Sequence, residues 1–495
     1  MPGGPIVKKL KLMPFLFLIF TTMLFAGCGG SSEPNSVAPL SADHVNLIFV
    51  TSPDLAYHTP GDVDPDTANL TGQGLQRSLM MATFLKDQVL GGENVNKIYT
   101  ISPMSHLQTA NNYPDMAAIG FIQQFALLNQ TTLPVDATDT YTANTFPINV
   151  SYTQSGVPNG AVGPSTDCPD CTGLDFNNVD GQNDTLVSGI ITHQTPGYNV
   201  FSAPWETVSA LLTMINTQYG YGLDLPSDYM GSNYVYAISI PSSGNASLAT
   251  YNSELSPPAS YPALPSPVTS VACSGSTRRV LTGGVDGVVI PPWINTNSKV
   301  HIVRHAEAHP DHNARFDNGN YVGAGQWRAL SLADTLAGRI YPDVVYSIDP
   351  AEMWYSNGFM NVSYVRPSLT ILPYVIANNL PYHLAAVPLG SPYEPTDETV
   401  AQATTEFLFF TCDTCGNFSN KTVLVAWESG HIKPFLNALI SRFGNDIPLL
   451  PDDWPSGDYD TIWTVSLDAQ GNLTIDNELC EGIESESLPG DAPLF

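Results

Sequence analysis

The chain has 495 residues, enough for two or more domains, and 43% of them are hydrophobic, which favours folded cores over disorder. Its 17 lysines and arginines face 46 acidic residues, so the formal net charge is -29. A surface of this charge repels nucleic acid and anionic lipid headgroups, and we expect neither to bind the folded body. A phosphorylated substrate would need a local basic pocket.

Residues 1–27 have the features of an export signal rather than of a folded segment. Three lysines, at positions 8, 9 and 11, precede an apolar run at 13–25 that is too short to span a bilayer. The run ends in Leu-Phe-Ala-Gly-Cys28, which resembles a bacterial lipobox with Phe25 where leucine is more usual. The resemblance predicts an exported lipoprotein, periplasmic or cell-surface, that lipid on Cys28 anchors to a membrane, with the bacterial outer membrane favoured. An ordinary secretory signal with an incidental cysteine is the alternative.

Four segments of the first half recur in the second half in the same order, which indicates an internal duplication. Each match is short, and their shared order and similar spacing favour duplication over chance. The matched pairs are residues 74–79 with 325–330, 96–103 with 343–350, 205–207 with 427–429, and 236–248 with 463–475. Strands alternate with helices in both copies, which predicts parallel pairing and a layered α/β domain in each.

The duplication also predicts where the domains begin and end. Residues 28–43 form a flexible Gly/Ser/Pro tether, and the two domains occupy 44–254 and 298–495, joined by a Pro/Ser-rich linker at 255–297. Residues 131–200, which are polar and Gly-rich, are interpreted as a long insertion of unknown role.

A short apolar strand at residues 300–303 leads directly into Arg304, His305 and Glu307. Arginine offers a planar fork of donors that matches phosphate oxygens, and a neutral histidine can act as a nucleophile. The alternative is that His305 is one of a group of surface or metal-binding histidines with His301, His309 and His312.

The aligned first copy lacks this pair of residues. Its strand at 46–50 aligns with 300–303, so that Thr51 and Ser52 stand where Arg304 and His305 stand in the second copy. His106 lies near the place where a second arginine would fall. The first copy is therefore predicted to be degenerate, with the fold but without the phosphoryl-transfer residues.

The Arg-His-Ala-Glu segment resembles the signature of the histidine phosphatase superfamily, which is phosphoglycerate mutase-like. A helical pattern at 321–336 and a strand at 343–350 follow it, in the order that the family has. The resemblance implies a fold of two tandem three-layer α/β/α domains with mostly parallel sheets. It also implies that His305 takes a phosphoryl group from the substrate and passes it to water, without a metal or other cofactor.

The resemblance extends to a second arginine and departs from the family at one position. Arg366, in Tyr-Val-Arg-Pro-Ser-Leu-Thr370, would be the second phosphate clamp, with Thr370 as a helix-side partner. Ser429 stands where the family has its second catalytic histidine, and it could still donate one hydrogen bond to a phosphate oxygen. His431, two residues further on, is the candidate to replace that histidine.

Several acidic residues lie near the motif. Glu307 is included among the catalytic candidates, although it more often orients such a site than donates a proton. The general acid that protonates the leaving alcohol is unassigned, and Glu394, Asp397 and Glu398 lie in the region where the family carries it.

Six cysteines are left after Cys28, an even number that suggests disulfides in an exported chain. Two CxxC pairs could each close locally, which would leave Cys273 to pair with Cys480. A four-cysteine zinc site is the alternative, and the sequence leaves the pairing open. The CxxC pairs are Cys168 with Cys171 and Cys412 with Cys415.

These observations lead to one function and two alternatives. The first is a lipid-anchored phosphomonoester hydrolase that acts on a phosphorylated small molecule through a phosphohistidine. A second possibility is a non-catalytic lipoprotein that binds a phosphate-like anion or another partner, which Ser429 favours. The third is a metal-binding lipoprotein that uses the cluster from His301 to His312.

Overall fold

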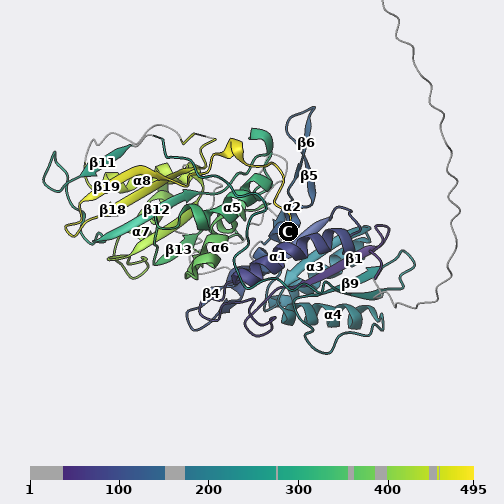
Figure 1. Cartoon of the computed structure of the whole chain (residues 1–495). Coiled ribbons are helices and arrows are strands. Elements are labelled where there is room, and N and C mark those ends of the chain that lie inside the picture. Colours follow the sequence, from purple (N-terminus) through teal and green to yellow (C-terminus); the bar gives the residue numbers. More distant parts are fainter. Residues whose placement is uncertain are drawn as a thin grey trace, which may run out of the picture. The chain divides into compact units, whose positions relative to one another are not determined.

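The computed structural model describes residues 37–150, 173–274, 277–354, 362–384, 398–444, 454–455 and 457–495, and of these Ala38–Phe495 form one compact unit (Figure 1). The predicted signal segment with Cys28, the cysteines Cys168 and Cys171, and the acids Glu394 and Asp397 lie outside the described residues. A search of the described helices finds none with the length and apolar character needed to cross a bilayer.

The first half forms a sheet of six strands in the order β10-β9-β1-β8-β2-β7. Strands β1, β8, β2 and β7 are parallel to one another, whereas β9 and β10 run antiparallel. The bounds are β10 Ser247–Asn252, β9 Tyr234–Ile240, β1 Val45–Thr51, β8 Gly197–Ala203, β2 Lys97–Thr100 and β7 Ile148–Asn149.

Helices cover both faces of this sheet because its central strands are apolar on both sides (Figure 1). On β1, Ile48 and Val50 join the core of helices α1 and α2, while Leu47 and Phe49 join that of α3 and α4. The helices are α1 Gly72–Phe84, α2 Ala117–Leu127, α3 Gln182–His193 and α4 Trp205–Tyr219. The period-two alternation of a strand thus produces three layers.

The second half forms a sheet of seven strands in the order β11-β19-β18-β12-β17-β13-β16. Strands β12, β17, β13 and β16 are parallel, and β18, β19 and β11 extend the sheet in antiparallel fashion. The bounds are β11 Arg278–Leu281, β19 Leu473–Cys480, β18 Thr461–Leu467, β12 Ser298–Arg304, β17 Thr422–Trp427, β13 Val344–Ser347 and β16 Tyr382–Leu384.

Helices α5 (Gly323–Thr335) and α6 (Arg366–Asn378) cover one face of this sheet, and α7 (Glu398–Phe409) and α8 (Ser429–Arg442) cover the other. Four two-residue strands and one hairpin lie outside these two sheets. They are β3 Leu107–Gln108, β4 Tyr113–Pro114, β14 Met353–Trp354, β15 Val362–Ser363, and the hairpin of β5 Gln130–Pro134 with β6 Thr140–Asn144. The predicted α/β class, with two mostly parallel sheets in three-layer domains, is confirmed.

One hydrophobic core joins the two halves, because α1 and α2 bury residues in the same cluster as α5 and α6. Side chains also bond across the halves. Gln123 donates to Asn320 at 2.9 Å, and Gln124 donates to the carbonyl of Pro493 near the C-terminus at 2.7 Å. The two sheets therefore share one core.

Strands at corresponding places in the two sheets have the same order and register. Thr51 lies opposite Ala203 in the first sheet, as Arg304 lies opposite Trp427 in the second. The residue after each strand also contacts this partner. The amide of Ser52 donates to the carbonyl of Ala203 at 2.9 Å, and the amide of His305 donates to the carbonyl of Trp427 at 2.9 Å. Ser52 thus occupies in its sheet the place that His305 occupies in the other.

Three of the four sequence matches agree with this register, and one does not. Trp205 opens α4, whereas Trp427 closes β17, so the residue that corresponds to Trp427 is Ala203. The match of 205–207 with 427–429 is therefore wrong by two residues. The similar residues lie at the start of a helix in the first copy and at the end of a strand in the second.

The structure corrects two further interpretations, one of the segment 131–200 and one of the predicted linker. Residues 131–200 are not simply an insertion, since they include β7, α3 and four residues of β8, all parts of the first layered domain. Within the predicted linker, β11 pairs with β19 and forms an edge of the second sheet. Both segments were polar enough to resemble loops, and edge strands and half-exposed helices carry that composition.

The two disulfides that fall within the described residues are those that local CxxC closure predicts. Cys412 bonds to Cys415, and Cys273 bonds to Cys480 across 207 residues. In the chain-entropy description, a crosslink of this span stabilises the fold by about 5 kcal/mol, because it restricts the unfolded chain. It attaches the linker to the last strand of the second sheet.

Candidate functional site

The candidate site lies where the parallel strands of the second sheet end. Arg304 is the last residue of β12 and His305 follows it, while β17 ends at Trp427 just before α8. Helix α6 begins at Arg366. Carboxyl ends of parallel strands share one edge of a sheet, and helix N-termini there favour anions.

His305 is buried, and one of its ring nitrogens has a fixed role. Nδ1 lies 2.8 Å from the carbonyl oxygen of Ala306, which can only accept, so Nδ1 carries the proton and Nε2 carries the lone pair. Burial, with Arg366 and Arg304 nearby, lowers the pKa of His305 well below 6.5. The imidazole is therefore neutral at physiological pH, as a nucleophile must be.

The backbone after His305 is fixed to helix α6. The amide of Ala306 donates to Oγ1 of Thr370 at 2.8 Å, and that hydroxyl donates to the carbonyl of Arg366 at 2.7 Å. Thr370 is therefore the helix-side partner that the sequence comparison anticipated. The rings of Tyr364 and Tyr459 lie at 6.1 and 6.0 Å from the ring of His305, between centroids.

Arg304 and Arg366 both belong to the site, and both are buried. Nη1 of Arg304 donates to the carbonyl of Asp458 at 3.1 Å, and its guanidinium lies 4.0 Å above the ring of Tyr459. Arg366 lies 4.5 Å above the ring of Tyr364. The aromatic faces orient both cations.

The fork of Arg366 is occupied by a carboxylate that the sequence did not reveal. Its two terminal nitrogens donate to the two oxygens of Asp317, at 2.6 and 3.0 Å. This bidentate arrangement is also the way in which arginine holds a phosphate. An anionic ligand must therefore compete with Asp317 for Arg366.

Ser429 and His431 both engage a second carboxylate, that of Glu428, which caps helix α8. Oγ of Ser429 donates to Oε1 at 3.2 Å, and the amide and Nδ1 of His431 each lie 3.2 Å from Oε2. Burial would raise the pKa of Glu428, but the bonds from His431 and Gly430, with Arg304 nearby, hold it below its usual range. Nε2 of His431 is buried without a hydrogen-bond partner among the described residues.

Glu307 does not have the contacts expected of a catalytic residue. It is buried against Arg328, which donates to it from Nε at 2.9 Å and from Nη2 at 2.7 Å, and Ser485 donates to it at 2.8 Å. Its oxygens hold the loop after β12 in place, and a catalytic role for Glu307 stays a prediction. The side chain of Glu398 lies outside the described part of the structure.

The described histidines near the motif contact different partners. Nδ1 of His301 lies 3.1 Å from Oγ1 of Thr464, and Nδ1 of His309 lies 2.6 Å from the carbonyl of Phe316. Among the described side chains, these contacts separate the histidines rather than gather them around an ion. The metal-binding alternative at His301 to His312 therefore has no support in the described geometry, and the side chain of His312 is not described.

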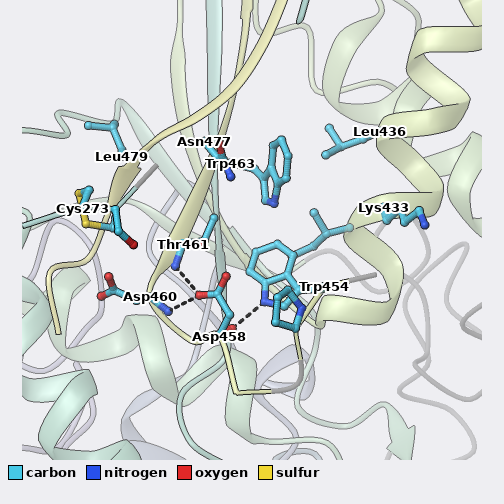
Figure 2. A pocket seen from close by; sticks show the side chains of 14 residues that line it. Cys273, Lys433, Leu436, Trp454, Asp458, Asp460, Thr461, Trp463, Asn477 and Leu479 are labelled. Atoms are coloured by element: carbon cyan, nitrogen blue, oxygen red, sulfur yellow. Dashed lines mark hydrogen bonds between the residues drawn. A yellow bond between two sulfur atoms is a disulfide. The ribbon is translucent and has the colours of Figure 1, made fainter. Parts of the chain in front are cut away.

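A cavity of about 390 Å³ is lined by residues of α8, β18 and β19 and of the turn before β18 (Figure 2). The indoles of Trp454 and Trp463 and the side chain of Leu436 from α8 face it. The carbonyl of Asp458 accepts hydrogen bonds from Nε1 of Trp454, at 2.6 Å, and from Nη1 of Arg304. The turn at Asp458 therefore belongs both to the cavity and to the candidate site. No sequence motif marks this cavity, because its lining comes from segments far apart in the chain.

No protein-family model and no curated protein matches the chain. A mycobacterial glucosyl-3-phosphoglycerate phosphatase of known structure is 13% identical over 35% of this chain and 93% of its own, with a TM-score of 0.22. A protein from Agrobacterium tumefaciens assigned as the phosphohistidine phosphatase SixA is 16% identical over 34% and 92%, with a TM-score of 0.21. Mycobacterial hydrolase 2 is 11% identical over 40% and 91%, with a TM-score of 0.24. At these scores the likeness is too weak to identify a function, which must be inferred from the geometry of the site.

Proposed function

We propose that the second half is a histidine phosphatase-like hydrolase of phosphomonoesters. The observation that carries the proposal is the state of His305, which is neutral, held as the Nδ1–H tautomer by Ala306, and close to two buried arginines. Such a ring presents a lone pair on Nε2 where Arg304 and Arg366 favour negative charge.

The proposed reaction has two steps. Nε2 of His305 bonds to the phosphorus while the ester P–O bond breaks, and the alkoxide leaves with a proton from an acid. Water then attacks the phosphohistidine, releasing inorganic phosphate and the free imidazole. Phosphoryl transfer depends chiefly on position and charge, which the arginines supply in both steps.

A second candidate function is binding of a phosphate-like anion without turnover. Two observations favour it, the serine at position 429 and the carboxylate of Asp317 in the fork of Arg366. Loss of a cationic donor weakens one charge-assisted bond, worth about 1.5–3 kcal/mol. Both functions need the same anion site, and turnover separates them.

Anion binding by the full chain tests that shared site. We expect Asp317→Asn to raise the affinity for orthovanadate by about tenfold, because one charged competitor for Arg366 is removed. Arg366→Ala and Arg304→Ala should each lower it by a similar factor or more. Isothermal titration calorimetry gives the dissociation constants.

The matched control is Asp311→Asn, an acidic residue of the same loop whose side chain bonds to Tyr141 instead. It should leave the affinity unchanged. Equal affinity in wild type, Asp317→Asn and Arg366→Ala would refute the assignment of the anion site.

We further propose that the two halves are tandem copies of one domain and that the protein is exported and anchored by lipid on Cys28. The common strand order and register support the duplication, and the sequence of residues 1–28 supports the anchor. Cys28→Ser should move the protein from the membrane fraction to the soluble fraction, since lipid chains provide the affinity that an acidic body lacks. Unchanged fractionation would contradict the anchor.

A further inference from the structure

The first half has its own cluster of titratable side chains, at the sheet edge that corresponds to the phosphate site of the second half. Asp54 follows β1, His106 follows the turn Pro103–Ser105 after β2, and Asp115 follows β4. Glu206 lies in the first turn of α4, which begins where β8 ends. This edge of the first half therefore carries a group of three carboxylates and one histidine.

Three of these side chains converge on one point. Nδ1 of His106 lies 3.0 Å from Oδ2 of Asp115 and 3.5 Å from Oδ2 of Asp54. One donor atom from each lies within 4.8 Å of the others. Metal bonds of about 2.0–2.2 Å place neighbouring ligands about 3.0–3.5 Å apart, and both distances from Nδ1 of His106 fall in this range.

The backbone orients each carboxylate through its other oxygen. Oδ1 of Asp54 accepts from the amide of Ala56 at 2.7 Å, and Oδ1 of Asp115 accepts from the amide of Ala117 at 2.9 Å. The ring of His106 is stacked on Phe176 with 3.6 Å between centroids. The three ligand atoms are thus held in place by contacts outside the cluster.

The cluster also lacks a donor that its buried oxygens require. Asp54 is 1% exposed, and its Oδ2 accepts no hydrogen bond in the described structure although it faces His106. Nδ1 of His106 has one proton at most, and Asp115 lies nearer to it. Oε2 of Glu206 is likewise buried without a partner. Unsatisfied buried carboxylate oxygens are costly unless a cation or donor meets them.

A cation bound between the carboxylates of Asp54 and Asp115 would relieve the repulsion between their charges.

We propose that Asp54, His106 and Asp115 form a binding site for a divalent first-row metal ion. One imidazole and several carboxylates suit ions such as Mn²⁺ and Zn²⁺. His106 binds through Nδ1 as the neutral Nε2–H tautomer, and a protonated ring first releases one proton to solvent. The site is separate from His305, so it does not depend on the proposed hydrolase activity.

Titration of the full chain with Mn²⁺ tests the site, with free Mn²⁺ followed by electron paramagnetic resonance. We expect one bound ion per chain with a dissociation constant of about 0.1 mM or lower, as for weak oxygen-rich sites. Asp54→Asn, Asp115→Asn and His106→Gln should each weaken binding by about tenfold or more. Zn²⁺ should displace the bound Mn²⁺, since it binds such ligands more tightly.

Two control variants define the location. Asp87→Asn removes an exposed acid of the same half and should bind Mn²⁺ as wild type does, as should His305→Ala. Circular dichroism identifies variants that have lost their fold. Asp54→Asn is the decisive variant, because its side-chain oxygen can still accept the hydrogen bond from the amide of Ala56. No Mn²⁺ binding below 1 mM, about the weakest affinity of such sites, or equal binding by wild type and a folded Asp54→Asn, would overturn the proposal.

Discussion

His305→Ala is expected to reduce hydrolysis of an aryl phosphate by about 1000-fold or to the rate in buffer, because the variant lacks the nucleophile. The matched control is His309→Ala, which removes a neighbouring histidine whose Nδ1 faces the carbonyl of Phe316. That variant should retain most of the activity. Equal rates for wild type and His305→Ala, measured as released phosphate, would contradict the assignment of the nucleophile.

The pH profile of the wild type should carry the signature of the buried ring. Burial, with Arg366 and Arg304 nearby, lowers the pKa of His305 well below 6.5, and only the unprotonated ring can attack. Activity should therefore persist as the pH falls through 6.5 and decline only well below it. A half-loss of kcat/KM near pH 6.5, assigned to His305, would show that the ring is not held neutral.

Arg328→Met is expected to lower the free energy of unfolding by about 3–5 kcal/mol, since it leaves buried charges without a partner. Arg328 is fully buried and binds Glu307 and Glu481, whose side chains are 7% and 0% exposed. Urea denaturation of the full chain measures the change.

The comparison for this prediction is Arg442→Met, which breaks a pair with Glu406 on the surface, where the side chains are 41% and 55% exposed. Such a pair contributes about 1 kcal/mol or less. Adding Glu307→Gln and Glu481→Gln to Arg328→Met should recover part of the loss. Similar losses from Arg328→Met and Arg442→Met would mean that the buried group is not a stabilising network.

The sequence predicted those parts of the fold that depend on local pattern. The apolar run before Arg304 forms β12, the helical spacing after Tyr321 forms α5, and Asn96 and Asp343 begin matched segments in register. Such features are encoded by neighbouring residues, so one sequence suffices to find them. The CxxC spacing likewise led to the pairing of Cys273 with Cys480.

The partners of the site residues were not predictable, because they arrive from distant segments. Asp317 lies 49 positions before Arg366 in the chain, and no motif marks it as the acid that fills the arginine fork. Glu307 lies beside the Arg-His pair, yet the fold turns it toward Arg328. Glu428 precedes Ser429 directly, but no motif marked it as the carboxylate that contacts Ser429 and His431.

The first-half cluster was missed for a different reason. His106 was noted only as a residue near the place of an absent arginine, and Asp54 and Asp115 belong to loops with no repeated spacing. Their convergence depends on the shared edge at the carboxyl ends of β1 and β2. A comparison with a family directs attention to the residues that the family uses, and here these are replaced.

The most direct test of the central claim is to look for a phosphoryl group on His305. The full chain is mixed with an aryl phosphate, denatured at alkaline pH, where phosphohistidine is stable, and digested for mass spectrometry. We predict that the peptide containing His305 gains one phosphoryl group, that the group is lost in acid, and that His305→Ala carries none. Phosphate release by the wild type with no phosphoryl group on this peptide at any time of quenching, or the same modification in His305→Ala, would contradict the account.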